Sequence, residues 1–159
     1  MQGSCKDPSG STVDMTTLTL RQRHDGLIAE HIAAECDHDI GRAVRTFHSA
    51  HYHVYPLALD APGTDAVRDL LGAVFDAFPD FAFVPHATHH ADRTVIVEGR
   101  ITGTHRGEWA GIAGSGNPVD VPTCCLYHFE DDRLLSETVY FDHATMLAQI
   151  NQPAATTQD

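Results

Sequence analysis

Several motifs that identify common enzyme classes are missing from this 159-residue sequence. It has no GxxxxGK(S/T) phosphate-binding loop, no HExxH zinc motif and no GxSxG nucleophile motif. The glycines at 111, 114 and 116 do not join a strand to a helix, as a dinucleotide-binding fingerprint requires. No stretch approaches the roughly 20 consecutive apolar residues of a membrane-spanning helix. Any reaction is therefore expected to proceed without a nucleotide, a flavin or another cofactor.

Positively charged residues are also scarce. Ten lysines and arginines stand against 22 aspartates and glutamates, so the net charge is −12 with neutral histidines. Nucleic acids and anionic membranes bind basic surfaces, and neither is expected as a partner. The first residues lack the apolar segment of a secretory signal, and no CxxC pair occurs among the four cysteines. We therefore expect a cytoplasmic protein with free thiols.

The spacing of apolar residues predicts helices in the first half of the chain and strands in the second. Helices are expected at 21–36, at 40–47, and from a cap at Thr64 to a stop at Pro79, with a short strand in HYHVYPLAL. From residue 80 the period changes to two, which predicts four consecutive antiparallel strands and then a short helix at 143–150.

This order of elements indicates an α+β fold and not βαβ repeats. We expect one domain over residues 19–151, with disordered tails at 1–18 and 152–159. A curved sheet wrapped over three helices would leave a concave apolar pocket, which is the usual place for a small-molecule ligand.

A series of short motifs runs through residues 98–150. They are GTHRG at Gly103–Gly107, GNPV at Gly116–Val119, FEDDRL at Phe129–Leu134, ETVYFD at Glu137–Asp142 and LAQI at Leu147–Ile150. Together with AVFDAFPDFAF at 73–83, this series resembles the SnoaL-like polyketide cyclases of the nuclear-transport-factor-2-like superfamily. The resemblance implies a cone-shaped α+β barrel, in which a curved, mainly antiparallel sheet wraps around three helices. It also implies a homodimer with a cofactor-free acid/base site inside.

Two residues carry the chemistry that the resemblance implies. In the cyclases, an aspartate at the position of Asp142 exchanges protons during an intramolecular aldol ring closure, and a histidine near His128 assists it. Val139 stands where the family has a tryptophan and Asp132 where it has a hairpin glycine, so the pocket is expected to change shape. Taken alone, the sequence favours Asp142 as the cap of helix 143–150. The resemblance favours catalysis, and both roles could coexist.

The position of His128 depends on the register of a hairpin. If Glu130, Asp131 and Asp132 form a three-residue loop, with Asp132 in the left-handed conformation, His128 shares a sheet face with Tyr140 and Asp142. A two-residue loop would place His128 on the opposite face. The family glycine at position 132 favours the three-residue loop, so we expect His128 and Asp142 to share the pocket.

Further candidates come from other polar and aromatic residues. His105, at the end of a strand, either orients substrate or bonds to its own loop. Trp109, in the glycine-rich loop, and Tyr140 are expected to contact substrate. His51, His53 and Tyr55 alternate along one strand face, and they either line the pocket or occupy a polar sheet face.

The twelve histidines raise the question of a metal. His51 and His53, or the group His86, His89 and His90, could supply ligands. No ligand signature is complete, so no metal is expected. Glu98 and Arg100 share a strand face in the manner of an epoxide-opening variant of the fold. Thr102 stands where that variant needs a carboxylate, which favours a structural ion pair between the two.

The leading hypothesis is a cofactor-independent enzyme of secondary metabolism that closes a ring in, or isomerises, a small polyketide-like carbonyl compound. Asp142 would act as the base, with His128 and His105 assisting. The alternative hypotheses are a small-molecule binding or scaffold protein of the same fold, and an epoxide-opening enzyme. A homodimer is expected through the outer sheet face, with Val95, Val97, Ile101 or their neighbours supplying apolar area.

Overall fold

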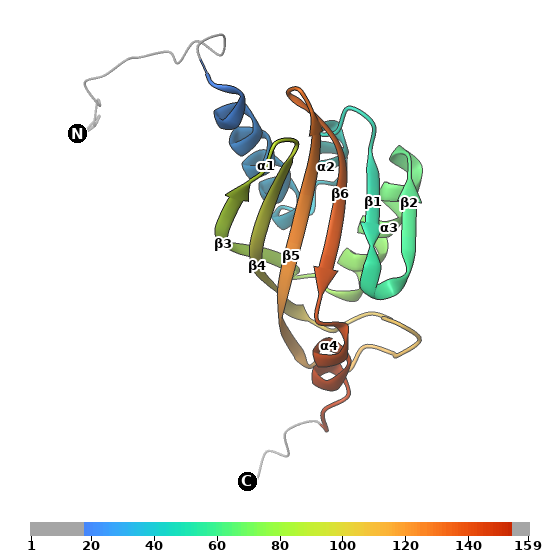
Figure 1. Ribbon diagram of the computed structural model, residues 1–159. Coiled ribbons are helices and arrows are strands. Elements are labelled where there is room, and N and C mark those ends of the chain that lie inside the picture. The colour runs from blue at the N-terminus through green and yellow to red at the C-terminus, as the bar shows by residue number, and fades with distance from the viewer. Residues whose placement is uncertain (1–17, 154–159) are drawn as a thin grey trace, which may run out of the picture.

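The structure is a computed structural model that describes residues 18–153; the tails expected at the two ends fall largely outside this range. A six-stranded sheet in the order β2-β1-β6-β5-β4-β3 forms one layer, and three helices form the other. Figure 1 shows the sheet in front, with α1, α2 and α3 behind it and α4 below β6. The sheet stays open, with β2 and β3 at its edges. No helix within residues 18–153 is long and apolar enough to cross a membrane.

The first two helices form where they were predicted. α1 spans Leu20–Cys36 and begins with a capping box, in which the Thr19 side chain accepts from the Gln22 amide and the Gln22 side chain accepts from the Thr19 amide. α2 spans Ile40–Arg45, and the Asp39 carboxylate caps it by accepting from the Arg42 amide. α1 contacts α2 and β3, so it lies across the inner face of the sheet.

The segment that follows is more complex than one strand. β1 (His51–Val54) turns through a short 3-10 helix at Tyr55–Leu57 into β2 (Leu59–Pro62), which pairs with β1 in antiparallel fashion. α3 (Thr64–Ala77) then crosses behind β1 and β2. Its N-cap is Gly63 and not the expected Thr64, and no side chain caps its first turn.

The second half is an antiparallel meander, as predicted. It comprises β3 (Ala82–His90), β4 (Thr94–Thr104), β5 (Pro118–Glu130) and β6 (Arg133–Phe141), and it ends in α4 (His143–Ile150). β6 also pairs in parallel with β1, and this contact joins the two halves of the chain into one sheet. The expected mixed α+β class with a mainly antiparallel sheet is confirmed.

The core lies between the inner face of the sheet and the helices. Val95 and Val97 on β4 are each 1% exposed and pack there with Phe83, Tyr127 and other core residues, and Ile101 packs against them. Of the residues expected to supply the outer face, Val95, Val97 and Ile101 are therefore wrong, and only their neighbours on β4 remain. Both faces of β4 carry apolar residues, so alternation alone did not identify which face the helices cover.

Candidate active site

The inner face of the sheet and the helices enclose one mainly apolar cavity, with a free volume of about 80 Å³. This is several times the roughly 10–15 Å³ that one water molecule needs. The apolar lining comes from α3 and the loop after it, the 3-10 helix, the sheet and α4: Val54, Leu57, Leu70, Leu71, Val74, Phe78, Phe81, Phe83, Ile101, Val139, Phe141 and Met146. The polar lining residues are fewer: Glu35, Tyr52, Trp109, Thr123, Cys125 and Glu137. Such a cavity, apolar with a few convergent polar groups, is typical of small-molecule sites.

Three of the polar lining residues meet around a buried histidine from α1. His31 Nε2 lies 2.8 Å from the Tyr52 hydroxyl oxygen, 3.1 Å from Glu137 Oε2 and 3.4 Å from Glu35 Oε1. The Tyr52 hydroxyl in turn donates to Glu35. All four side chains are buried: His31 is 0% exposed, Glu137 2%, Tyr52 3% and Glu35 6%. We call His31, Glu35, Tyr52 and Glu137 the inner polar cluster.

The fold brings these four residues together from three elements. His31 and Glu35 are one helical turn apart on α1 and face the sheet. Tyr52 on β1 and Glu137 on β6 are register partners across the parallel strand pair, so their side chains lie side by side on the inner face.

The protonation of His31 follows from its partners. Thr46 Oγ1 donates to the Ala43 carbonyl over 2.6 Å, so it accepts the proton of His31 Nδ1 over 2.7 Å. Burial by itself lowers the pKa of His31, but the charge of Glu35 and hydrogen bonds to Glu137 and Glu35 outweigh it and raise that pKa from 6.5 to about 10. His31 is therefore an imidazolium at neutral pH. One imidazolium faces two carboxylates, so it compensates only one of them.

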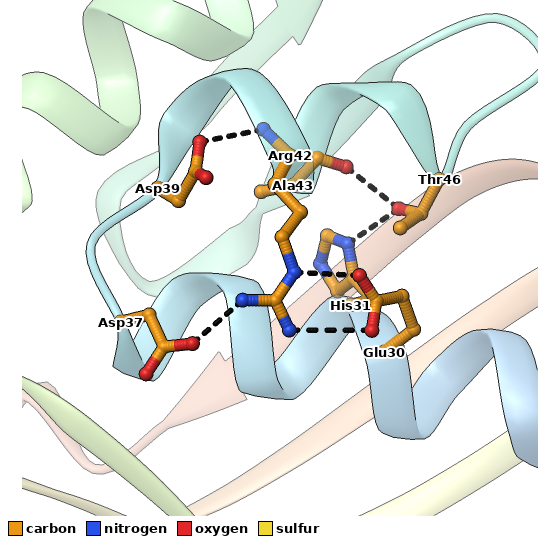
Figure 2. A network of polar contacts seen from close by, with 7 residues as sticks. All are labelled: Glu30, His31, Asp37, Asp39, Arg42, Ala43 and Thr46. Carbon is orange, nitrogen blue, oxygen red and sulfur yellow. Dashed lines mark hydrogen bonds and ion pairs between the residues drawn. The ribbon is translucent and has the colours of Figure 1, made fainter.

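A second set of contacts holds α1 against α2 around His31 (Figure 2). The Arg42 guanidinium on α2 donates to both carboxylate oxygens of Glu30 and to Asp37. Figure 2 shows His31 reaching from α1 to Thr46, at the end of α2, beside this contact. The Arg42 contacts join the two helices, and the hydrogen bond to Thr46 holds the imidazole ring.

Tyr52 and Cys125 keep their protons in this environment. Burial, followed by the charges of Glu137 and Glu35, raises the pKa of the Tyr52 hydroxyl well above its ordinary value. Burial and the Glu137 charge do the same for the pKa of the Cys125 thiol. Tyr52 is thus suited to donate a hydrogen bond, whereas Cys125 lacks the thiolate character of a nucleophile.

Asp142 does not belong to this cavity. It is exposed and caps α4: its Oδ1 accepts from the Thr145 amide over 2.9 Å, and its Oδ2 accepts from the Thr145 hydroxyl over 2.7 Å. These two hydrogen bonds lower the pKa of Asp142, which makes it a weaker base. The expectation that Asp142 is directed into the pocket is wrong, because the strand alternation that points Phe141 inward points Asp142 outward.

His128 also lies on the outer face. The hairpin has a two-residue loop at Asp131–Asp132, not the expected three-residue loop, and Asp131 takes the positive φ of 53°. A bulge between His128 and Phe129 compensates for the shorter loop, so His128 pairs with Ser136 and shares a face with Tyr140. His128 therefore shares the expected face with Tyr140, but that face is opposite the cavity, so the expectation that His128 and Asp142 share the pocket is wrong. His128 bonds there to Thr138 and Thr94, over 3.1 and 3.2 Å.

Four other candidates occupy the outer face with it. Tyr55 stacks on Tyr140 with 5.0 Å between ring centroids, and these two tyrosines are 61% and 43% exposed. His51 and His53 both contact the Asp60 carboxylate on β2. Tyr52 and Val54 alternate with His51 and His53 along β1 and take the inner positions. Of the two alternatives, His51 and His53 therefore occupy the polar outer face of the sheet and do not line the pocket.

The two remaining candidates, His105 and Trp109, differ in position: His105 contacts the glycine-rich loop and Trp109 lines the cavity. His105 is fully buried but does not line the cavity; its Nδ1 accepts from the Ser115 amide over 3.2 Å and so holds the glycine-rich loop. Trp109 lines the cavity as expected, and its Nε1–H is buried without a hydrogen-bond partner in the described part of the chain. Such an indole N–H is available to a bound ligand.

The epoxide-opening alternative loses its basis. Arg100 pairs with Asp120, and Glu98 contacts His86 and His89, so the expected ion pair between Glu98 and Arg100 does not form. Both residues are exposed on the outer face and lie away from the cavity.

The inner polar cluster escaped the sequence analysis, although it left two signals. His31 falls on the same stripe of its helix as Leu27 and Ile32, and Glu35 follows it by four residues on the same side. Glu137 occupies a strand position of the same parity as Val139 and Phe141, where an apolar residue would be ordinary. A charged residue at a core position is a stronger indication of function than a charged residue at a helix start.

The same cluster also offers metal-ligand atoms, since one atom each of His31, Glu35 and Glu137 lies within 4.8 Å of the others. A divalent ion there would have to replace the proton on His31 Nε2. The raised pKa of His31 favours the proton in that position at neutral pH.

An open, curved sheet backed by helices around an inner cavity is the nuclear-transport-factor-2/ketosteroid-isomerase-like fold. The chain belongs to the SnoaL-like polyketide cyclase family, whose model matches residues 33–150. Among curated proteins, none matches the sequence significantly.

Solved structures share the fold at low sequence identity. A protein from Jannaschia sp. CCS1, assigned as a SnoaL-like polyketide cyclase, is 19% identical with a TM-score of 0.73, over 83% of this chain and 94% of that one. AclR from Streptomyces galilaeus, assigned as a hydroxylase, is 18% identical with a TM-score of 0.71, over 88% and 87%. IdmH from Streptomyces antibioticus, assigned as a polyketide cyclase, is 22% identical with a TM-score of 0.64, over 80% and 98%.

Proposed function

We propose that this protein is a cofactor-independent acid/base enzyme that removes a proton next to the carbonyl group of a small, largely apolar compound. The outcome is ring closure or isomerisation of a polyketide-like substrate. The observation that carries the proposal is the inner polar cluster, in which two carboxylates, a tyrosine hydroxyl and an imidazolium meet at an apolar cavity. The cluster replaces Asp142 and His128 in the roles first expected of them.

Glu137 is the proposed base. Glu35 accepts from the Tyr52 hydroxyl and also contacts His31, whereas Glu137 has His31 as its contact within the cluster. Within the cluster, Glu35 is therefore occupied by Tyr52, and Glu137 is the carboxylate left for the substrate. Glu137 is almost fully buried and lines the cavity, so a substrate there would meet it without intervening bulk water.

Tyr52 and His31 complete the proposed mechanism. As the substrate loses its proton to Glu137, negative charge develops on the carbonyl oxygen, and the Tyr52 hydroxyl turns its one proton from Glu35 to this oxygen. His31 does not line the cavity, so its role is to position Tyr52 and the two carboxylates. Protonated Glu137 then returns the proton to the product carbon. Trp109 Nε1 offers a further donor for orienting the substrate.

The alternative is a small-molecule binding protein without catalysis. The helix-capping role of Asp142 favours it, because the residue first expected to be the base is engaged elsewhere. The inner polar cluster favours the enzyme, because a pure binding site has no need for two buried carboxylates around one imidazolium.

Proton exchange tests the proposal without knowledge of the natural product. Cyclic and aromatic ketones small enough for the cavity would be incubated with the protein in D₂O, and deuterium uptake next to the carbonyl would be followed by NMR. We expect uptake above the buffer rate, and a loss of about 100-fold or more in Glu137→Gln. The matched control is Asp142→Asn, which should exchange within about two-fold of the native rate, because Asp142 lies outside the cavity.

Two results would contradict the proposal. Ketones that raise the melting temperature yet exchange only at the buffer rate would identify a binding protein. Undiminished exchange in Glu137→Gln would exclude Glu137 as the base.

A further inference from the structure

A second cluster of polar side chains lies on the outer face of the sheet, away from the cavity. It consists of His51 and His53 on β1 and Asp60 on β2. His51 Nε2 lies 2.6 Å and His53 Nδ1 lies 2.8 Å from the same oxygen, Asp60 Oδ1. The three ligand-type atoms are all within 4.8 Å of one another.

We propose that His51, His53 and Asp60 form a binding site for a divalent transition-metal ion of the Zn²⁺ type. Two imidazoles and one carboxylate are a donor set that zinc accepts, with the fourth position left to water. The sequence alone supplied only the two histidines; the antiparallel pairing of β1 with β2 adds the carboxylate.

The backbone fixes the geometry of this site. His51 and His53 are two residues apart on one strand and therefore face the same side. His53 and Asp60 are register partners across the hairpin, and the imidazole ring centroids are 4.1 Å apart. A tetrahedral ion with bonds of about 2.0–2.1 Å separates its ligand atoms by about 3.3 Å. The observed 2.6 and 2.8 Å contacts need to open by less than an ångström, which side-chain torsions can supply.

Metal binding changes which nitrogen of each imidazole carries the proton. Without metal, His51 Nε2 hydrogen-bonds to Asp60 Oδ1, and His53 Nδ1 lies within ion-pair distance of the same oxygen. With metal, the ion lies between the three ligand atoms, and each imidazole binds through a lone pair while its other nitrogen carries the proton. The side chains of His51 and His53 are 32% and 36% exposed and that of Asp60 is 61% exposed, so water can reach both the ion and its open position.

The site lies directly behind the inner polar cluster. Tyr52 stands between the two histidines in sequence and points to the opposite face of the sheet. A bound ion would join β1 to β2 and so hold the strand that carries Tyr52. The proposal does not depend on the reaction, because the ion and the cavity occupy opposite faces.

Metal titration of the tag-free protein tests the site. Calorimetry with Zn²⁺ should give one site per chain, and Co²⁺ should give the visible absorption typical of four- or five-coordinate cobalt. Zn²⁺ should also raise the melting temperature. We expect His53→Ala, His51→Ala and Asp60→Asn each to weaken binding strongly, by about 100-fold for a lost histidine.

The matched control is His89→Ala. His89 is another histidine on the outer face, with Nε2 3.2 Å from Glu98 Oε1, but it belongs to no convergent triad of the described residues. The affinity of the His89→Ala variant for Zn²⁺ should stay within about two-fold of the native value. Absence of saturable binding would overturn the proposal. So would binding that persists in a folded His51→Ala/His53→Ala variant, because the ion would then sit elsewhere, for example in the inner polar cluster.

Discussion

Tyr52 and Glu137 lie opposite each other across the parallel pair β1–β6, and His31 Nε2 bridges them at 2.8 Å from the tyrosine oxygen and 3.1 Å from the carboxylate. These contacts join α1 and β1, from the N-terminal half of the chain, to the C-terminal strand β6 beside the cavity. It also supplies both a hydrogen-bond donor and a base on one face of the sheet, which is what proton removal next to a carbonyl requires.

Replacing Tyr52 by phenylalanine should reduce deuterium exchange by about 100-fold or more, because the hydroxyl that stabilises the developing oxyanion is removed. It should also lower the free energy of unfolding by about 1–3 kcal/mol, since Glu35 loses a buried hydrogen-bond donor. NMR exchange rates and urea denaturation measure the two effects.

Tyr127→Phe is the matched control for that variant. Tyr127 is fully buried on β5, which β6 separates from β1, and its hydroxyl has no hydrogen-bond partner among residues 18–153. Removal of the Tyr127 hydroxyl should leave the exchange activity and the free energy of unfolding nearly unchanged. Equal effects of the two substitutions would argue against a specific role for Tyr52.

The raised pKa of His31 makes stability depend on pH in the alkaline range. In the folded protein the pKa of His31 is about 10, against an ordinary 6.5, so the folded state binds the proton more tightly. Its contribution to stability is complete below about pH 6.5 and is lost progressively as the pH rises through 10. Urea denaturation from pH 6 to 10 should show this decline.

The control for this prediction is His31→Gln, which keeps a polar side chain but does not titrate. Its overall stability should be lower, and its stability should change less between pH 6.5 and 10. Parallel pH profiles of the two proteins would show that His31 is not the group responsible.

Much of the fold could be predicted because local signals agree with it. The caps at Thr19, Asp39 and Asp142, the apolar stripe of α3 and the period-two strands all follow from side chains that act on their own neighbours. Val139, which stands where the family has a tryptophan, lines the cavity, so this departure does affect the pocket.

The site was harder to predict because it depends on contacts that local signals do not determine. In β5, Thr123, Cys125 and Tyr127 alternate with Cys124, Leu126 and His128, and both sets are partly apolar. Which set faces the helices is decided by the packing of the whole sheet. The bulge beside Phe129 and the parallel pairing of β1 with β6 join residues far apart in the chain, and neither has a local sequence signature.

A homodimer through the outer sheet face remains our prediction, now with different residues. Tyr55, Val84 and Tyr140 are exposed apolar or aromatic side chains on that face, at 61%, 52% and 43%. Sedimentation at micromolar concentration should give a dimer, and Tyr140→Glu should shift it toward monomer because a buried unpaired charge is costly. The control is Leu20→Glu, at an exposed residue of α1, which should leave the protein dimeric. A monomeric native protein would contradict the prediction.

The role of Asp142 can be separated into capping and catalysis by two substitutions. Asparagine caps a helix about as well as aspartate, so Asp142→Asn should change the free energy of unfolding by only a few tenths of a kcal/mol. Alanine removes both hydrogen bonds to Thr145 and should cost about 1 kcal/mol. Both variants should keep native exchange activity at temperatures where they are folded, because the carboxylate lies outside the cavity. A variant that is as stable as the native protein but inactive would return Asp142 to the mechanism and remove Glu137 as the sole base.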